Sequence, residues 1–407
     1  IPEEEKISVI GAASIPAVGV RKGQIVNIEE ATTGITSCVE AAERMAGYGL
    51  SKALVSIGGA HIASQNSRGV VAVAEPEGEI TGDDVRRVME AARAISLPSS
   101  REILHCLPRF FIVDSQDGIK DPLGMTGVRL EVETHIITGS TTAMRNLAKC
   151  VSEVGVDIES LVFSGLASAV SVLTETEKEL GVVLVDIGGG TTNIVVSIEG
   201  APAYTAVLPI GAKNVTNDVA IGMRLSLETA EKLKLALSEV PKKIAQPGEE
   251  KEEESLPDEI NLENLGVYEE AKTVSRKTLV EGIIKPRLNE IFTMVGLEIK
   301  KSGFGGMTPS GIVLTGGGAQ TVGVVEAAKR TLAMPVRVGV PGGVSGLVDD
   351  ILNPAFAACV GLILYGSKME EQGTGKISFS QLGRMVQRVP IRGVAQKFTE
   401  LIKSLLP

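Results

Sequence analysis

The stretch that decides the fold is Gly181-Val-Val-Leu-Val-Asp-Ile-Gly-Gly-Gly-Thr-Thr-Asn-Ile-Val-Val-Ser-Ile-Glu-Gly200. An apolar run, Val182 to Val185, leads into an aspartate, three glycines and two threonines, and a β-rich run, Ile194 to Ile198, leads away. The pattern predicts a β-hairpin whose tip exposes backbone amides. Glycines allow close approach to the backbone, and successive amides bind anions. Because a plain hairpin needs only a two-residue turn, the extra residues favour a phosphate-binding loop.

Side chains of this loop extend the prediction. Asp186 stands at the end of the first apolar run, where its carboxylate can hold a hydrated Mg²⁺ ion. Mg²⁺ keeps several of its waters in protein sites, so we expect Asp186 to bind the metal through water. The hydroxyls of Thr191 and Thr192 can donate hydrogen bonds to phosphate oxygens.

The composition of the 407-residue chain is that of a globular protein with two or three domains. Hydrophobic residues make up 43% and aromatic residues only 3%, which favours an α/β protein with Val- and Ile-rich strands. A net charge of −10 argues against a nucleic-acid partner, which would need a basic face. No apolar run approaches the ~20 residues of a membrane-spanning helix.

The cysteines and histidines are few and scattered. Neither a zinc site nor a disulfide framework is predicted, and free thiols fit a reducing cytoplasm. Histidine-based metal or triad chemistry is not expected either. The residues concerned are Cys38, Cys106, Cys150, Cys359, His61, His105 and His135.

Strand and helix patterns extend on both sides of the hairpin. Residues 28–46 have the spacing of a helix. Between about residues 64 and 138 the pattern changes to short strands with one helix, and Pro108 is expected to separate two of those strands. This region predicts a small α+β unit inserted in a larger α/β domain. Residues 278–301 predict a long helix that kinks or breaks at Pro286.

A second strand–glycine element, Gly311-Ile-Val-Leu-Thr-Gly-Gly-Gly-Ala319, follows the first. Between the two, a helical segment carries Glu231 and Lys234 one turn apart. Each feature alone is common, since glycines often form tight turns and Glu-x-x-Lys pairs often lie on helix surfaces. Their order favours a nucleotide site, with one loop on the phosphates, the other on the adenosine half and the helix on the ribose and base.

Longer motifs extend along the chain. They are Gly118-Ile-Lys-Asp-Pro-Leu-Gly-Met-Thr-Gly-Val128, Phe163-Ser-Gly-Leu-Ala-Ser-Ala169, Val185-Asp-Ile-Gly-Gly-Gly-Thr-Thr192, Ala230-Glu-Lys-Leu-Lys234 and Asn353-Pro-Ala-Phe-Ala357. On these motifs the sequence resembles the superfamily of actin and heat-shock-chaperone ATPases and, within it, the FtsA family of bacterial cell-division proteins. The resemblance covers almost the whole chain.

The resemblance implies an α/β, actin-like two-domain fold. Two duplicated ribonuclease-H-like cores would carry an inserted α+β subdomain in place of the usual fourth subdomain. The boundaries we expect are 1–63 and 139–180 for subdomain 1A, 64–138 for the inserted subdomain 1C, 181–215 and 308–366 for subdomain 2A, 216–307 for subdomain 2B, 367–391 for a linker, and 392–407 for a membrane-targeting helix.

The resemblance also implies a set of nucleotide-binding residues. ATP and Mg²⁺ would be the cofactors, held by a second phosphate loop and its neighbours, a nucleoside clamp and an adenosine loop. The second phosphate loop would be Asp186, Gly188, Gly189, Gly190, Thr191 and Thr192, with Gly211 and Lys213 beside it. The nucleoside clamp would be Glu231 and Lys234, and the adenosine loop would be Gly316, Gly317 and Gly318.

Two departures from the superfamily pattern affect these expectations. The chain opens at Ile1, and an acidic run leads directly to a strand at Ile7, so we expect the first strands and their Asp-x-Gly-Thr phosphate hairpin to be missing and ATP binding to be weak. Ser164 stands where actins and chaperones carry the Gln or Glu that positions the attacking water. A serine orients that water poorly, so we expect at most weak ATPase activity and assign no catalytic residue.

The last residues predict a basic amphipathic helix after a flexible connector. Such a helix suits the plane of a membrane interface and anionic headgroups, although an ordinary terminal helix packed on the core would show similar spacing. The basic bias in an acidic chain favours the membrane. The residues expected to bind it are Arg392, Val394, Lys397, Phe398, Leu401, Ile402, Lys403, Leu405 and Leu406.

The function that the resemblance implies is that of a scaffold at the cytoplasmic face of the inner membrane, at the division site. It would bind ATP, assemble head to tail with copies of itself, and tether filaments of the tubulin-like protein FtsZ, whose tail would dock on residues 216–307. Two alternatives stay open: a related adaptor of another membrane machine, such as pilus assembly, and a small-molecule kinase of the same superfamily.

Overall fold

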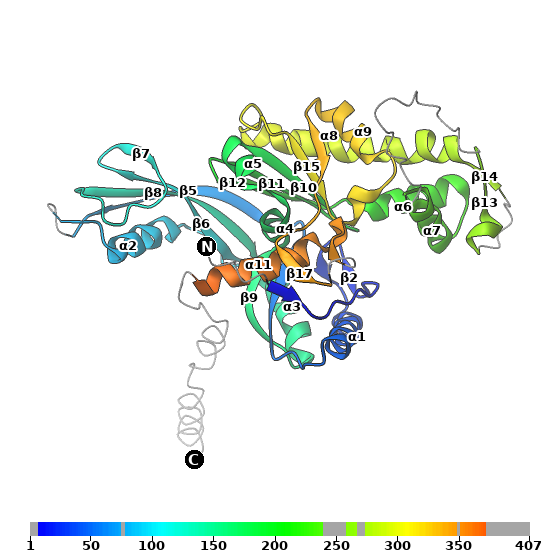
Figure 1. Cartoon of the computed structure of the whole chain (residues 1–407), viewed down its shortest axis with the longest axis horizontal. Helices are drawn as coiled ribbons and strands as arrows, with labels where there is room; N and C mark the ends of the chain where they lie inside the picture. The colour runs from blue at the N-terminus through cyan, green and yellow to red at the C-terminus, as the bar shows by residue number, and fades with distance from the viewer. Residues whose placement is uncertain (1–6, 75–77, 239–257, 267–272, 348–350, 372–407) are drawn as a thin grey trace, which may run out of the picture.

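The computed structural model describes residues 7–74, 78–238, 258–266, 273–347 and 351–371 (Figure 1). They form two α/β halves and an inserted unit that projects from the first half, on the side opposite β13 and β14 (Figure 1). The predicted α/β class is confirmed. The second half holds the glycine-rich hairpin and the larger hydrophobic core.

The second half is built on a five-stranded sheet in the order β12-β11-β10-β15-β16. The predicted hairpin is confirmed, because β10 and β11 pair antiparallel with Val185 opposite Ile194. Strands β15 and β16 run parallel to β10. The strands are β10 (Val182–Ile187), β11 (Thr192–Ile198), β12 (Ala201–Leu208), β15 (Ile312–Thr315) and β16 (Val336–Val338).

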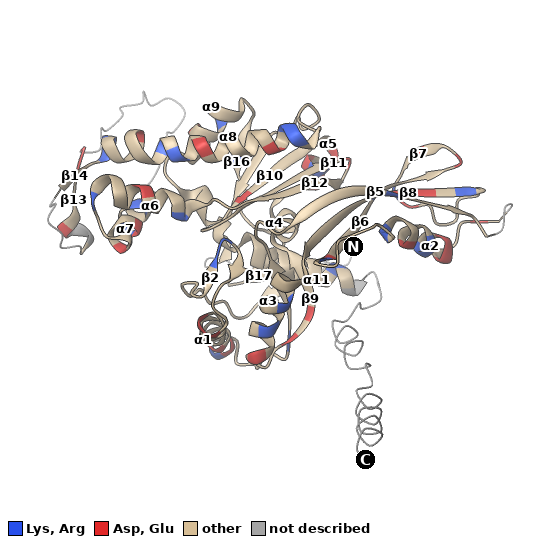
Figure 2. Ribbon diagram, turned by 180° about the vertical axis from the view of Figure 1, so that it is seen from behind, with Lys and Arg blue, Asp and Glu red and all other residues tan. Residues whose placement is uncertain are grey.

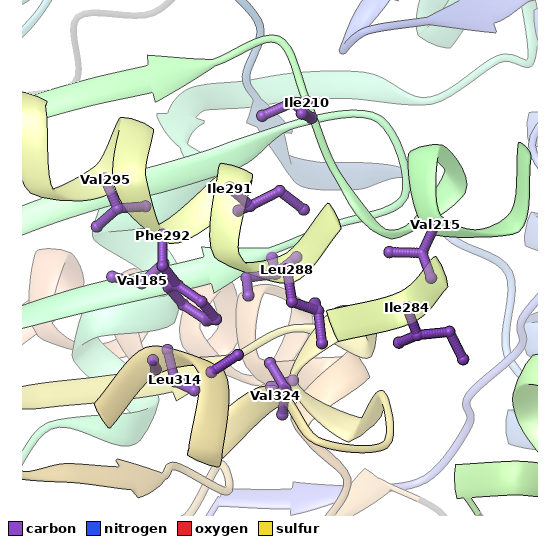
Figure 3. Close-up of a cluster of buried hydrophobic side chains, with 14 of the residues drawn as sticks. Val185, Ile210, Val215, Ile284, Leu288, Ile291, Phe292, Val295, Leu314 and Val324 are labelled. Carbon is purple, nitrogen blue, oxygen red and sulfur yellow. The ribbon is translucent and has the colours of Figure 1, made fainter. Parts of the chain in front are cut away.

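Helix α8 (Lys285–Ser302) covers one face of this sheet. Its side chains Leu288, Ile291, Phe292 and Val295 point toward the sheet and are fully or almost fully buried (Figure 3). The helix is preceded by a π-helical segment, η2 (Thr278–Ile284), and Pro286 lies in the first turn of α8. The two segments are continuous, because the Lys285 amide donates to the Val280 carbonyl, and the π-helical turn accommodates a proline, which has no amide to donate. The helix therefore does not break at Pro286; it changes from π-helical to α-helical just before that residue.

The remaining elements of the second half surround this core. Charged residues recur along α8 (Figure 2), where Arg287 binds Asp218 and Glu290. The elements are α6 (Ala212–Met223), α7 (Leu227–Ser238), β13 (Glu259–Asn261), η1 (Leu262–Leu265), β14 (Thr273–Ser275), η3 (Gly317–Gln320) and α9 (Val324–Leu332).

The first half centres on the parallel pair β4–β9. Its first helix, α1, spans the predicted residues and begins at Asn27, whose side chain accepts from the Glu30 amide. Strand β1 pairs with β17, close to the end of the described chain. The elements are β1 (Ile7–Val9), β2 (Val20–Arg21), β3 (Gln24–Ile25), α1 (Ile28–Ala46), β4 (Lys52–Ile57), α3 (Thr141–Glu153), β9 (Asp157–Phe163), α4 (Ser164–Val172), α5 (Glu175–Leu180), β17 (Val344–Gly346), η4 (Pro354–Phe356) and α11 (Ala357–Glu371).

Helices α4 and α11 pack against each other at backbone distance. A Cβ added at Gly361 would lie 1.8 Å from the Ala167 carbonyl oxygen, so only glycine fits there. Helix α11 extends to Glu371, which places residues 367–371 of the predicted linker in a helix. The remainder of that linker lies outside the described residues.

The inserted unit is a four-stranded antiparallel sheet in the order β5-β8-β6-β7, with α2 packed on β5 and β8. The prediction that Pro108 separates two strands is wrong. Strand β6 runs through Pro108, and an irregular register between Pro108 and Phe110 absorbs the proline, as bulges do. The elements are β5 (Ala63–Ala72), α2 (Gly82–Arg93), β6 (Arg101–Val113), β7 (Gln116–Ile119) and β8 (Arg129–Ser140).

Polar contacts fasten the inserted unit to β12 of the second half. Ser64 Oγ donates to the Thr205 carbonyl at 2.7 Å, and His135 Nε2 lies 3.2 Å from Thr205 Oγ1. Burial, with Arg109 and His105 nearby, lowers the pKa of His135 to about 3. The ring is therefore neutral near pH 7, where it packs between the inserted unit and β12.

Candidate functional site

The two predicted glycine loops meet at one edge of the second-half sheet. Strands β10 and β15 pair in parallel with Asp186 opposite Thr315, so both strands end at the same level. A Cβ at Gly316 would lie 2.3 Å from Asp186 Oδ1, and one at Gly318 would lie 2.4 Å from Ile187 Cγ2. Ligands of open α/β sheets bind outside the carboxyl ends of the strands. This edge is the candidate nucleotide site.

Asp186 is buried at the centre of this edge. Its Oδ2 accepts from Ser168 Oγ at 3.0 Å and from Asn193 Nδ2 at 3.1 Å. Burial raises the pKa of Asp186, and these two hydrogen bonds only partly oppose that shift. A nearby cation would favour the carboxylate, and one carboxylate together with phosphate oxygens suits Mg²⁺. The residue therefore fits the predicted metal role.

The first glycine loop is held against the start of α6. The amides of Ala212 and Lys213 donate to the carbonyls of Gly188 and Gly189, at 2.9 and 2.8 Å. Gly211 must be a glycine, because its Cβ would lie 2.4 Å from the Gly188 carbonyl oxygen. A Cβ at Gly189 would meet nothing within 4 Å, so this part of the loop is open to a ligand.

The two threonines of the loop differ in their surroundings. Thr191 is half-buried, and its carbonyl accepts from the Gly188 amide at 2.8 Å. Thr192 is fully buried on β11, and its hydroxyl donates to the Ile210 carbonyl at 2.8 Å. Thr192 therefore supports the loop from inside, whereas Thr191 is partly exposed.

Glu231 and Lys234 form the predicted pair on α7. Lys234 Nζ donates to Glu231 Oε2 at 2.7 Å and to Thr216 Oγ1 of α6 at 2.9 Å. Burial is the largest influence on Glu231 and would raise its pKa, but the hydrogen bonds from Lys234 and Thr216 together hold that pKa below its usual value. Lys234 is almost fully buried and Glu231 is half-exposed, so the carboxylate can accept from a ligand hydroxyl.

A cavity of about 440 Å³ lies beside the second glycine loop. The end of α7, with Leu237 and Ser238, forms one wall, and Ala319 and Gln320 of η3 form another. Val338, at the end of β16, places the cavity on the same sheet edge as Asp186. Its volume is within the range of small-ligand pockets. Sequence reasoning missed Ser238, although it follows Lys234 by one turn on the same helix.

Ser164, the expected water-positioning residue, begins α4. Its hydroxyl donates to the Ile57 carbonyl at 3.0 Å, which leaves that proton engaged within the protein. The residues expected to bind the membrane, 392–407, lie outside the described part of the chain. Within the described part, no group of three or more His, Cys, Asp or Glu side chains is arranged to hold a metal, and none of the helices is long and apolar enough to cross a bilayer.

Comparisons with known proteins settle the family. The model "SHS2 domain inserted in FTSA" matches residues 59–138, and the model "Cell division protein FtsA" matches residues 183–361. The chain is 40% identical over 373 residues to the cell division protein FtsA of Pseudomonas aeruginosa, covering 92% of this chain and 86% of that protein. This chain belongs to the FtsA family of cell division proteins.

Further matches agree with this assignment. The FtsA of Bacillus subtilis is 37% identical over 388 residues, which cover 95% of this chain and 84% of that protein. Among solved structures, the PilM-PilN type IV pilus biogenesis complex matches with a TM-score of 0.57 at 16% identity, covering 88% of this chain and 92% of the other. That likeness concerns the fold alone. The predicted actin-like fold with an inserted subdomain is confirmed, and the inserted unit is the SHS2 domain of the FtsA family.

Proposed function

We propose that this FtsA-family chain binds ATP with Mg²⁺ at the carboxyl edge of the β10–β15–β16 sheet. The observation that carries the proposal is the pairing of Asp186 with Thr315, which puts both glycine loops on one edge. The open face of Gly189 would bind the phosphates, and the Glu231 carboxylate would accept from a ribose hydroxyl. The base would occupy the cavity at Ser238. Asp186 would hold the Mg²⁺ through water, and the ion would screen phosphate charge.

Bound ATP would support self-assembly of the chain and would be hydrolysed slowly or not at all. The Ser164 hydroxyl donates to a backbone carbonyl. The next three residues of α4, Gly165, Leu166 and Ala167, are buried and have no carboxylate or amide side chain that could orient water. Water orientation is a main protein contribution to phosphoryl transfer. We therefore propose binding with at most weak ATPase activity.

The substitution Ser238→Trp tests the position of the base. An indole would fill the cavity beside η3, and we expect the dissociation constant for Mg-ATP, measured by calorimetry, to rise at least tenfold. Leu235→Trp is the matched control, because Leu235 lies on the same helix, is 50% exposed and is not part of the cavity wall. Equal affinity of the two variants would place the base elsewhere. No binding of ATP by the unsubstituted chain would contradict the nucleotide proposal itself.

The cellular role that we propose is a tether at the cytoplasmic face of the membrane at the division site. The chain would assemble head to tail, bind FtsZ, and attach through residues 392–407 to anionic lipid. Family membership supports the division role. In the region 216–307, where the FtsZ tail is proposed to dock, Ile221 and Leu227 are 77% and 56% exposed and offer apolar contacts for a partner.

Removing Gly393–Pro407 tests the membrane attachment. We expect the full chain to sediment with vesicles that contain anionic lipid and the truncated chain to stay in the supernatant, because the deletion removes the apolar face that would enter the interface. Both proteins should unfold at the same temperature. Pelleting of the truncated chain with the same vesicles would show that another part of the chain binds lipid.

The alternatives predict other outcomes. A pilus-type adaptor would keep nucleotide and lipid binding but would not sediment with FtsZ filaments. A small-molecule kinase would show rapid, multiple-turnover phosphorylation of its substrate. FtsA-family membership favours the division role over both.

A further inference from the structure

A lysine at the tip of the β2–β3 hairpin touches the phosphate loop. A Cβ at Gly190 would lie 3.4 Å from both the Cα and the N of Lys22, so the loop backbone packs directly on this residue. In Figure 1 the hairpin lies between α1 and the second-half sheet. The contact joins segments that are far apart in the sequence and that belong to different halves of the molecule.

The hairpin tip is held in a fixed conformation. Lys22 and Gly23 have φ angles of +49° and +74°, the left-handed pair of a tight hairpin turn. Glycine suits such a turn, whereas a lysine there is strained. A Cβ at Gly59 would lie 3.2 Å from the Lys22 carbonyl oxygen, so a second glycine-containing loop packs on the other side. Three backbone segments thus fix the base of one long cationic side chain.

The position of Lys22 along the phosphate loop indicates which part of a bound nucleotide would lie near its ammonium group. The loop begins at Gly188, which contacts Gly211 in the half that holds the base cavity, and reaches Lys22 at Gly190. A nucleotide with its base in that cavity would extend its phosphates along the loop toward the first half. Lys22 is exposed and takes part in none of the ion pairs between described residues, so its ammonium is available to an anion.

We propose that Lys22 binds the terminal phosphate of the nucleotide and makes the site prefer a nucleoside triphosphate to a diphosphate. The inference rests on the proposed nucleotide site and adds a residue from the first half to it. The hairpin is hydrogen-bonded to the start of α1, where the amides of Val26 and Asn27 donate to the Gly19 carbonyl at 2.8 and 3.1 Å. The backbone that carries the Lys22 side chain is therefore held in place.

The substitution Lys22→Gly separates the charge from the turn. Glycine adopts the left-handed conformation without strain, so the fold should be retained while the ammonium is lost. We expect the dissociation constant for Mg-ATP to rise about tenfold, as loss of one charge-assisted hydrogen bond produces, and that for Mg-ADP to change less than about twofold. Lys22→Arg, which keeps a cation, should retain most of the preference for ATP.

Arg21→Ala is the matched control, because it removes one exposed positive charge from the adjacent position of the same hairpin. We expect it to leave the ratio of the two dissociation constants unchanged. Unchanged binding of both nucleotides by Lys22→Gly, or equal weakening of both, would overturn the inference and leave the nucleotide site standing. If the unsubstituted chain bound neither nucleotide, the proposed function would fail, and this inference with it.

Discussion

The substitution Gly361→Ala is expected to lower the free energy of unfolding by about 3 kcal/mol, the upper end of the cost of overpacking a core. The added methyl group would lie 1.8 Å from the carbonyl oxygen of Ala167 and 2.4 Å from its carbonyl carbon. Both are backbone atoms of the neighbouring helix α4, so no side-chain rotation relieves the clash. Helix α11 would have to move away from α4 along its whole contact.

Thermal unfolding measures this effect. At roughly 2–4 °C per kcal/mol for domains of this size, the midpoint should fall by about 6–12 °C. Gly282→Ala is the matched control, because Gly282 is also helical and exposed, and its added Cβ would approach no atom closer than 4.0 Å. The control should be neutral or slightly stabilising, since alanine has the higher helix propensity. Equal midpoints for the two variants would contradict the close packing of α4 and α11.

Local signals explain what the sequence predicted well. Helix α1 has the predicted bounds because its apolar spacing, the cap at Asn27 and a left-handed glycine at position 47 all act within a few residues of each other. The β10–β11 hairpin follows from two continuous apolar runs on either side of a glycine-rich turn. The contact of Gly361 with Ala167 joins segments almost two hundred residues apart and could come only from the structure.

Contacts between distant segments explain what the sequence did not predict. The continuation of β6 through Pro108 depends on pairing with β8, which supplies most of the ladder. Ser238 could have been found by extending the Glu231–Lys234 helix by one turn, but its cavity also needs η3, which lies far along the chain at Gly317–Gln320. The approach of Lys22 to Gly190 left no signal in either segment alone.

The substitution Asp186→Asn is expected to weaken Mg-ATP binding by about 10–100-fold, the range seen when groups that support a metal site are lost. Asparagine has nearly the same shape, and its amide oxygen can accept the hydrogen bonds that Ser168 and Asn193 donate to Oδ2. Because burial already raises the pKa of Asp186, a neutral side chain removes a cost of desolvation. The unliganded variant should therefore be at least as stable as the unsubstituted chain.

This pairing of effects separates a metal role from a structural one. If Asp186 only held the fold together, Asp186→Asn, which keeps both hydrogen bonds, would keep its affinity for Mg-ATP. Asp186→Ala should in addition lose about 1–3 kcal/mol of stability, because it leaves the two buried donors without an acceptor. The affinity for Mg-ATP should also fall at low pH. As the pH falls through the raised pKa of Asp186, its carboxylate becomes protonated and no longer attracts the metal ion. Affinity of Asp186→Asn should be independent of that titration. If chelation of Mg²⁺ left the nucleotide affinity of the unsubstituted chain unchanged, the proposed metal role of Asp186 would be wrong.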